Sequence, residues 1–119
     1  MTNNGVGELA YIIVDSHDNE LLASFWSNLL GLEITERSGP YIDLGSPGEQ
    51  SPVISFQKVH ELKVTKNRIH LDVRVDDLEN ATRKVESLGG RLVKECLEGS
   101  FDWRVMTDPE GNEFCIVTE

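Results

Sequence analysis

The chain has 119 residues, of which 39% are hydrophobic, and it carries a formal net charge of −10 at pH 7. This length fits one domain with room for a single core or for two fused half-cores. The acidic balance argues against nucleic acid and anionic membranes as partners, because binding to phosphates requires lysine and arginine side chains on one face. It would raise the local concentration of a cationic ligand or a metal ion, although a solvated acidic surface is the more common meaning of such a charge balance.

The N-terminal residues MTNNGVGE contain no basic segment followed by an apolar one, and they predict no export signal. The apolar runs are far shorter than the ~20 residues needed to span a bilayer. Cys96 and Cys115 share no CxxC spacing, so we expect reduced, buried thiols, with one disulfide as the alternative. Together these features predict a cytoplasmic protein.

The first half of the chain predicts a strand, a helix and three more strands. Residues 8–15 form an apolar run rich in β-branched side chains, which is typical of a strand. Asp18 is expected to cap a helix whose apolar residues recur at three- and four-residue spacing, and Gly31 is expected to end it. The further strands are predicted at residues 32–37, 41–44 and 52–59.

The second half repeats this order after a polar connector at residues 60–66. Residues 69–75 alternate between apolar and polar side chains, as a half-buried strand does. Asp77 is expected to cap the second helix, which Gly89 and Gly90 end. The last strands are predicted at residues 91–95, 101–107 and 113–117.

Each half therefore predicts a βαβββ unit. An offset of 59 residues aligns the two capping aspartates, and an offset of 58 residues aligns Leu30-Gly31 with Leu88-Gly89. Duplication explains this agreement, and chance agreement of two similar patterns is the alternative. We expect an α+β fold in which two tandem βαβββ modules form a curved mixed sheet around a cavity, with the helices on its outer face. The domain covers residues 1–119, with module one at about 6–59, the connector at 60–66 and module two at about 67–119.

Polar side chains share one side of the strands in the second half. His70, Asp72 and Arg74 alternate with apolar residues on the first strand, and Glu113 opens the last strand, on the side opposite Phe114. Unpaired charges on a dry sheet face would each cost several kcal/mol. The pattern therefore favours a cavity filled by water or a small molecule, with a solvent-exposed sheet face as the alternative.

Two segments carry a resemblance to a known family. They are KNRIHLDVRVDDL at residues 66–78 and WRVMTDPEGNEFCIV at residues 103–117, and DPEGNEF is the most specific part. With VDSHD, FW and LGL in the first half, the chain resembles the glyoxalase, bleomycin-resistance and extradiol-dioxygenase (vicinal oxygen chelate, VOC) superfamily over essentially its whole length. That superfamily hosts isomerases, dioxygenases, resistance proteins and non-catalytic binders. The resemblance implies the duplicated fold and a homodimer whose cavity is shared with, or completed by, a second subunit.

In metal-dependent members, the resemblance implies four ligands, one from the first and one from the last strand of each module. His70 and Glu113 match the two positions of module two, where a histidine and a glutamate are usual. Imidazole and carboxylate groups suit Zn²⁺, Fe²⁺, Mn²⁺ or Ni²⁺. Glu113 would then be a metal ligand and also the nearest proton acceptor, which makes it the candidate catalytic residue.

Module one departs from this metal pattern. The 59-residue offset places Tyr11 at the position of the module-two histidine, and Glu8 takes that position only if the strand register shifts. On the last strand, Ser55 or Gln57 falls near the ligand position, and only Gln57 has a side chain suited to coordination. The expected metal ligands are therefore His70, Glu113 and Gln57.

Five side chains are candidate contacts for a small molecule: Tyr11, Asp72, Arg74, Trp103 and Cys115. The strand pattern is compatible with Trp103 on either face of the sheet. Trp26, in contrast, lies on an apolar helical stripe and is expected in the core. No neighbouring histidine is expected to activate the Cys115 thiol. The segment from Asp108 to Asn112 has the composition of a tight turn and is expected to be structural.

Three functions stay open. The favoured one is a binding or resistance-type protein that holds a small cationic or aromatic molecule without metal, because the metal ligand set is incomplete and the chain is acidic. The second is a divalent-metal-dependent lyase, isomerase or dioxygenase that acts on a substrate with vicinal oxygens. The third is a non-catalytic interaction domain on the same scaffold.

Overall fold

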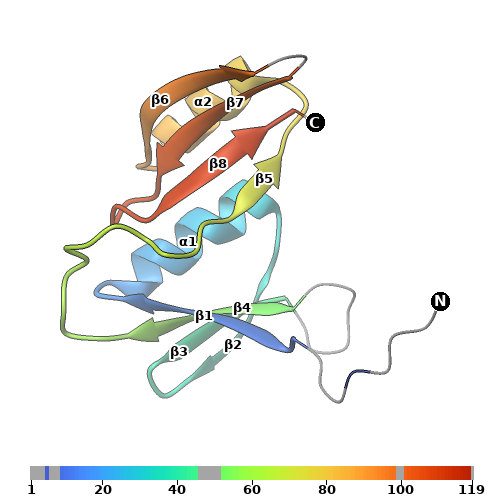
Figure 1. Ribbon diagram of the computed structural model, residues 1–119. Helices are drawn as coiled ribbons and strands as arrows, with labels where there is room; N and C mark the ends of the chain where they lie inside the picture. The colour runs from blue at the N-terminus through green and yellow to red at the C-terminus, as the bar shows by residue number, and fades with distance from the viewer. Residues whose placement is uncertain (1–4, 6–8, 46–51, 99–100, 119) are drawn as a thin grey trace.

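The computed structural model describes residue 5 and residues 9–45, 52–98 and 101–118, apart from the side chains at positions 98 and 101. Within this part of the chain, two helices and eight strands follow one another in the order βαβββ, βαβββ (Figure 1). The predicted α+β class and the two predicted modules are confirmed. The connection between the strands predicted at residues 41–44 and 52–59 lies mostly outside the described residues. Neither of the two described helices has the length and apolar character needed to cross a membrane.

Module one contains β1 (Tyr11–Ser16), α1 (Asn19–Leu30), β2 (Ile34–Ser38), β3 (Tyr41–Leu44) and β4 (Val53–Lys58). Its sheet has the order β1-β4-β3-β2, with β1 parallel to β4 and the other pairs antiparallel. Asp18 caps α1 as predicted, because its carboxylate accepts a hydrogen bond from the backbone N–H of Leu21. Gly31 ends the helix with a φ of 68°, a left-handed conformation that glycine adopts without steric cost.

Module two contains β5 (Asp72–Arg74), α2 (Leu78–Ser87), β6 (Arg91–Glu98), β7 (Phe101–Thr107) and β8 (Glu113–Val117). Its sheet has the matching order β5-β8-β7-β6, and β5·β8 is again the one parallel pair of the described sheet. Asp77 caps α2 as predicted by accepting hydrogen bonds from the backbone N–H groups of Glu79 and Asn80.

Two strands of module two differ in length from their predictions. The alternation over residues 69–75 predicts one strand, but only Asp72–Arg74 pairs with β8, and His70 therefore precedes the strand. Conversely, β6 continues beyond residue 95 to Glu98, because β7 supplies a partner for each added residue. Strand ends thus depend on the partners available, which alternation along one strand does not reveal.

A β-bulge occurs at the same place in both modules. The register of β2 with β3 shifts between Ile34 and Glu36, and the register of β6 with β7 shifts between Leu92 and Lys94. The 58-residue offset that aligns the helix ends also aligns these two bulges. Since a bulge is a specific feature of a fold, its repetition supports the duplication predicted from the sequence.

Helix α1 lies between two separate sheets, whereas the sequence predicted helices outside one curved sheet (Figure 1). It contacts β1, β3 and β4 of its own module. Its Phe25 and Trp26 rings also pack against Phe114 of β8, with ring centroids 6.1 and 4.7 Å apart. Trp26 is buried in the core, as predicted. The apolar surface of α1 is wide enough to serve two sheets, and this width explains its central position.

One buried core joins the two modules. Its members come from both helices and both sheets: Leu22, Ala23, Phe25, Trp26, Ile42, Leu44, Phe56, Val85, Met106, Phe114 and Ile116. Helix α2 covers β6, β7 and β8. Both helices therefore cover the inner faces of the sheets, and the opposite face of each sheet stays open.

The turn that follows β7 ties module two to module one. The Asp108 carboxylate accepts a hydrogen bond from Trp26 Nε1 at 3.0 Å. The Glu110 carboxylate accepts a hydrogen bond from Ser16 Oγ at 2.8 Å. It accepts two more from the backbone N–H groups of His17 and Asp18, at 2.9 and 2.6 Å. Burial raises the pKa of Asp108, and its hydrogen bonds with Asn112 and Trp26 oppose that rise. The predicted structural role of this turn is thus the joining of two modules.

Candidate functional site

The first open face belongs to the sheet of module one. Ile42 and Phe56 point inward to the core, so strand alternation places their neighbours on the open side. The side chains of this face include Tyr11, Ile13, Asp15, Tyr41, Asp43, Ser55 and Gln57. Part of the face forms a hollow of about 610 Å³, lined by Tyr11, Ile13, Thr35, Glu36, Ser38, Tyr41, Asp43 and Ser55.

Ser55 is the buried polar group of this hollow. It is 2% exposed, and its hydroxyl has no hydrogen-bond partner among the described residues. A buried hydroxyl without a partner costs about 1–3 kcal/mol. The hollow therefore contains a polar atom that the described part of the chain leaves unsatisfied.

The second open face belongs to the sheet of module two. Phe114 and Ile116 of β8 point to the core, so Glu113 and Cys115 lie on the open side. Arg104 of β7 points inward, because its guanidinium donates a 2.7 Å hydrogen bond to Thr82 Oγ1 of α2. The adjacent Trp103 therefore lies on the open face, beside Val117 of β8. The face includes Asp72, Arg74, Trp103, Val105, Glu113, Cys115 and Val117. His70, just before β5, lies beside Asp72 and Cys115 on the same face.

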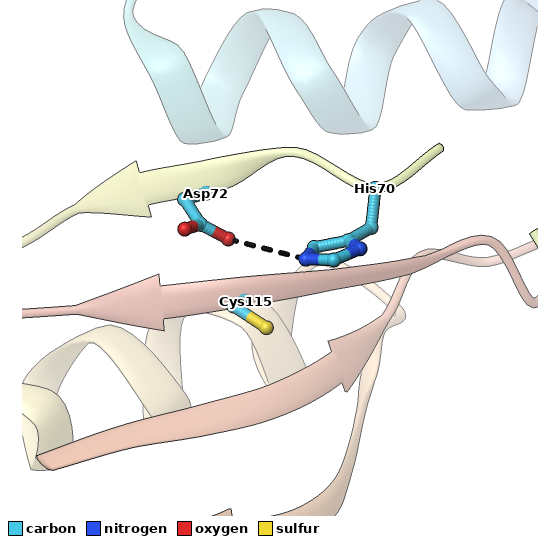
Figure 2. Close-up of side chains that lie close together, drawn as sticks. All are labelled: His70, Asp72 and Cys115. Atoms are coloured by element: carbon cyan, nitrogen blue, oxygen red, sulfur yellow. Dashed lines mark ion pairs between the residues drawn. The ribbon is translucent and has the colours of Figure 1, made fainter. Parts of the chain in front are cut away.

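Three potential metal ligands meet on this second face (Figure 2). His70 Nε2 lies 3.7 Å from Asp72 Oδ1, and the ligand atoms of His70, Asp72 and Cys115 all lie within 4.8 Å of one another. His70 and Asp72 are two positions apart, with Leu71 between them, so both point the same way. Asp72 is the register partner of Cys115 on the parallel strand β8. The His70 and Asp72 side chains are 61% and 59% exposed, so solutes reach them from solvent.

The surroundings of Cys115 favour its protonated form. Burial raises its pKa, and the negative charge of Asp72 raises it further. The sequence predicted that no neighbouring histidine activates the Cys115 thiol. The fold does bring His70 close to Cys115, but the pKa of the thiol is raised rather than lowered. Both cysteines are free as predicted, although each is half-buried rather than buried.

Glu113, the predicted metal ligand and catalytic residue, is held by an ion pair with Lys66. The hydrogen bond from Lys66 lowers the pKa of the Glu113 carboxyl below its usual range. An ionised carboxylate with a lowered pKa is a weaker proton acceptor, and a metal ion would have to compete with Lys66 for it. Lys66 lies in the predicted connector, so the strand pattern did not predict its ion pair with Glu113.

The predicted metal set of His70, Glu113 and Gln57 does not come together within one chain. His70 and Glu113 lie on the second open face, whereas Gln57 lies on the first, in a different sheet. Tyr11 also lies on the first open face, and Glu8, its alternative, lies outside the described residues. Within one chain the three predicted ligands therefore lie apart, and their joint role as a metal site stays a prediction.

His70 and Glu113 share a sheet face rather than an enclosed hollow. A cleft of about 220 Å³ between the modules is lined mostly by apolar residues, and Glu113 lines it while His70 does not. Its lining includes Ile12, Trp26 and Phe114. The predicted cavity between the two side chains is thus an open surface in the single chain.

The profile of the Glyoxalase-like domain matches residues 11–117, which span both modules. The chain belongs to this family. Glyoxalase-like domains are part of the glyoxalase, bleomycin-resistance and dioxygenase superfamily that the sequence predicted. No curated protein sequence matches this glyoxalase-like chain.

Solved structures of superfamily members share the fold. An enzyme of the glyoxalase/bleomycin resistance protein/dioxygenase family from Burkholderia phytofirmans PsJN superposes with a TM-score of 0.79 at 21% identity, covering 94% of this chain and 98% of its own. The fosfomycin resistance protein FosX from Listeria monocytogenes gives 0.78 at 13% identity, covering 97% and 95%. The bleomycin resistance determinant encoded on transposon Tn5 gives 0.65 at 21% identity, covering 95% and 98%. At these identities the likeness establishes the fold alone.

Proposed function

We propose that this glyoxalase-like protein binds a small cationic or aromatic molecule between open sheet faces contributed by two copies of the chain. The observation that carries the proposal is that both sheets have one uncovered face. On the first open face, Tyr11, Ile13 and Tyr41 leave large apolar surfaces exposed to solvent. Adjacent exposed apolar side chains are typical of a surface that binds a ligand or a protein.

The position of the helices explains why two copies are needed. Both helices pack on inner faces, and α1 touches both sheets, so the two open faces of one chain point away from each other. A single chain has no second sheet with which to close a cavity over either face. A second copy supplies one, and this supports the homodimer implied by the family resemblance.

The chemistry of the first open face fits a cation that carries a flat apolar group. Glu36 and Asp43 line its hollow together with Tyr11 and Tyr41. Carboxylates attract a positive charge, and tyrosine rings add cation–π and stacking contacts. The net charge of −10 raises the local concentration of such a ligand. Bleomycin is the first compound to test, because a bleomycin resistance determinant has this fold.

The test combines sedimentation velocity with calorimetric titration of bleomycin and of a panel of cationic aromatic compounds. Ile13→Lys places a charge on the first open face, where Ile13 is 51% exposed, and should convert a dimer to a monomer and weaken ligand binding at least about tenfold. Val64→Lys is the matched control, because Val64 is 88% exposed and lies in the connector. A monomeric wild type, or ligand binding that Ile13→Lys leaves unchanged, would contradict the proposal.

A second candidate function is a divalent-metal-dependent lyase, isomerase or dioxygenase. The group of His70, Asp72 and Cys115 favours it, because three protein ligands leave a position free for the oxygens of a substrate. Zn²⁺, Fe²⁺, Mn²⁺ and Ni²⁺ are the ions to load. Turnover of a substrate with vicinal oxygens by the loaded wild type, and its loss in His70→Ala, would support this function over simple binding.

A further inference from the structure

We infer that His70, Asp72 and Cys115 form a site for one thiophilic divalent ion such as Zn²⁺, without Glu113. The site requires neither turnover nor an organic ligand, and it goes beyond the small-molecule binding proposed above. It differs from the set suggested by the family resemblance in using Asp72, the first outward residue of β5, and Cys115, the second outward residue of β8, alongside His70.

The spacing of the three side chains suits a tetrahedral ion. Ligand atoms around tetrahedral Zn²⁺ lie roughly 3.3–3.6 Å apart, given bond lengths of about 2.0–2.3 Å. His70 Nε2 and Asp72 Oδ1 are 3.7 Å apart, and all three ligand atoms lie within 4.8 Å of one another. Small side-chain rotations close the remaining difference, and the exposure of His70 and Asp72 permits them.

The backbone already fixes the positions from which these ligands reach the ion. Asp72 and Cys115 are register partners in the β5·β8 ladder, and the backbone N–H of Cys115 donates a 2.9 Å hydrogen bond to the carbonyl of Leu71. His70 is adjacent to Leu71 in the chain. Ligands held on paired strands lose little conformational freedom when they bind an ion, which favours binding.

The donor types decide which ions the site prefers. An ion that binds here displaces the thiol proton of Cys115, so its donors are one imidazole, one carboxylate and one thiolate. This set suits Zn²⁺, Co²⁺ and Cd²⁺, whereas Mg²⁺, Ca²⁺ and Mn²⁺ prefer all-oxygen sites. Three protein ligands leave a fourth position for water or another ligand, as in catalytic rather than structural zinc sites.

The Lys66 ammonium keeps Glu113 out of this group. It forms an ion pair with the Glu113 carboxylate, and the same carboxylate lies near Lys63 as well. Glu113 therefore has a cationic partner already, while the ion pair of Asp72 with His70 is long and exposed. Of the two outward acidic side chains on β5 and β8, Asp72 is the one available to an ion.

The test is a titration of the reduced, tag-free full-length protein with Co²⁺, followed by absorption spectroscopy. Binding should saturate at one ion per chain and produce a thiolate-to-cobalt charge-transfer band, which Zn²⁺ should remove by displacement. Cys115→Ser should abolish the band, and His70→Ala should weaken binding on the order of 100-fold or more. Mg²⁺ should not displace the cobalt.

Cys96→Ser is the matched control, because Cys96 lies on the same sheet, in β6, and is equally half-buried. It should retain both the band and the affinity, and circular dichroism should confirm that every variant folds. Glu113→Gln should also retain the band. Absence of the band in the folded wild type, its survival in Cys115→Ser, or its loss in Glu113→Gln would overturn the inference.

Discussion

The two open faces share one strand arrangement but differ in the chemistry of their side chains. Each belongs to a four-stranded sheet of matching order, with a bulge at the matching place. The first face offers aromatic rings, a buried hydroxyl and carboxylates, whereas the second offers an imidazole, a thiol and a carboxylate beside cationic side chains. The inward residues of both sheets build one common core, whereas the outward residues of the two faces differ in chemistry. Two faces with complementary chemistry are what a cavity made by two copies would combine.

The largest expected effect is on the stability of the whole fold, because both open faces depend on the common core. Phe114→Ala removes the ring that contacts Phe25 and Trp26 across the modules, and should lower the free energy of unfolding by about 3–5 kcal/mol. Urea denaturation measures this loss. Val64→Ala, at an exposed position, should leave the unfolding midpoint nearly unchanged. A small loss in Phe114→Ala would mean that the two sheets do not depend on a common core.

The turn that joins the two modules should have the next largest effect on stability. Glu110→Gln weakens three hydrogen bonds from module one to a carboxylate, and should cost about 1.5–3 kcal/mol. Glu86→Gln, on the exposed side of α2, is the matched control. Denaturation of both variants, with hydrogen exchange at the backbone amides of residues 17 and 18, separates a loosened joint from a general loss of stability. Equal stability of the two variants would contradict the role of the turn.

A substitution confined to the first face should have a smaller effect. Ser55→Ala removes a buried hydroxyl that has no partner among the described residues. The free energy of unfolding of this variant should change by less than about 1 kcal/mol, or rise slightly, because no hydrogen bond is lost. Ligand affinity should fall if the hydroxyl contacts the ligand. Loss of several kcal/mol in thermal denaturation would mean that the hydroxyl has a structural partner.

The smallest expected effect is on the second face and depends on pH. The Glu113 pKa is lowered by Lys66 in the folded protein, so the stability contributed by this pair is present above the ordinary glutamate pKa and is lost as the pH falls through the lowered value. Lys66→Gln should raise the Glu113 pKa toward its usual range and reduce the stability that is lost at low pH. An NMR titration of the Glu113 carboxyl in both proteins measures the shift. An identical titration would show that Lys66 does not hold Glu113 in solution.

Local signals in the sequence were sufficient for most of the fold. Asp18 and Asp77 cap their helices as predicted, because an N-cap needs only a side-chain acceptor and the next few N–H groups. The predicted strands 41–44, 101–107 and 113–117 match β3, β7 and β8. Each of these signals depends on residues that are close in sequence.

The errors concern contacts between residues far apart in sequence. The central position of α1 depends on Phe114 meeting Trp26, and the group of His70, Asp72 and Cys115 depends on the register of β5 with β8. The His-x-Asp and Glu-x-Cys spacings on the first and last predicted strands of module two were a usable signal for that group. Lys66 gave no such signal, because the direction of a connector side chain is not determined by strand alternation.

The repeated bulge has a consequence for the behaviour of the protein at high concentration. Strands β2 and β6 are edges of their sheets, and each contains one of the two bulges. An unbroken edge strand offers its free N–H and C=O groups to other molecules and promotes fibril growth, whereas a bulge interrupts that row. The β2 and β6 edges are therefore poor templates for added strands, and any strand that joins the crowded protein should add at β1 or β5, the opposite edges of the two sheets.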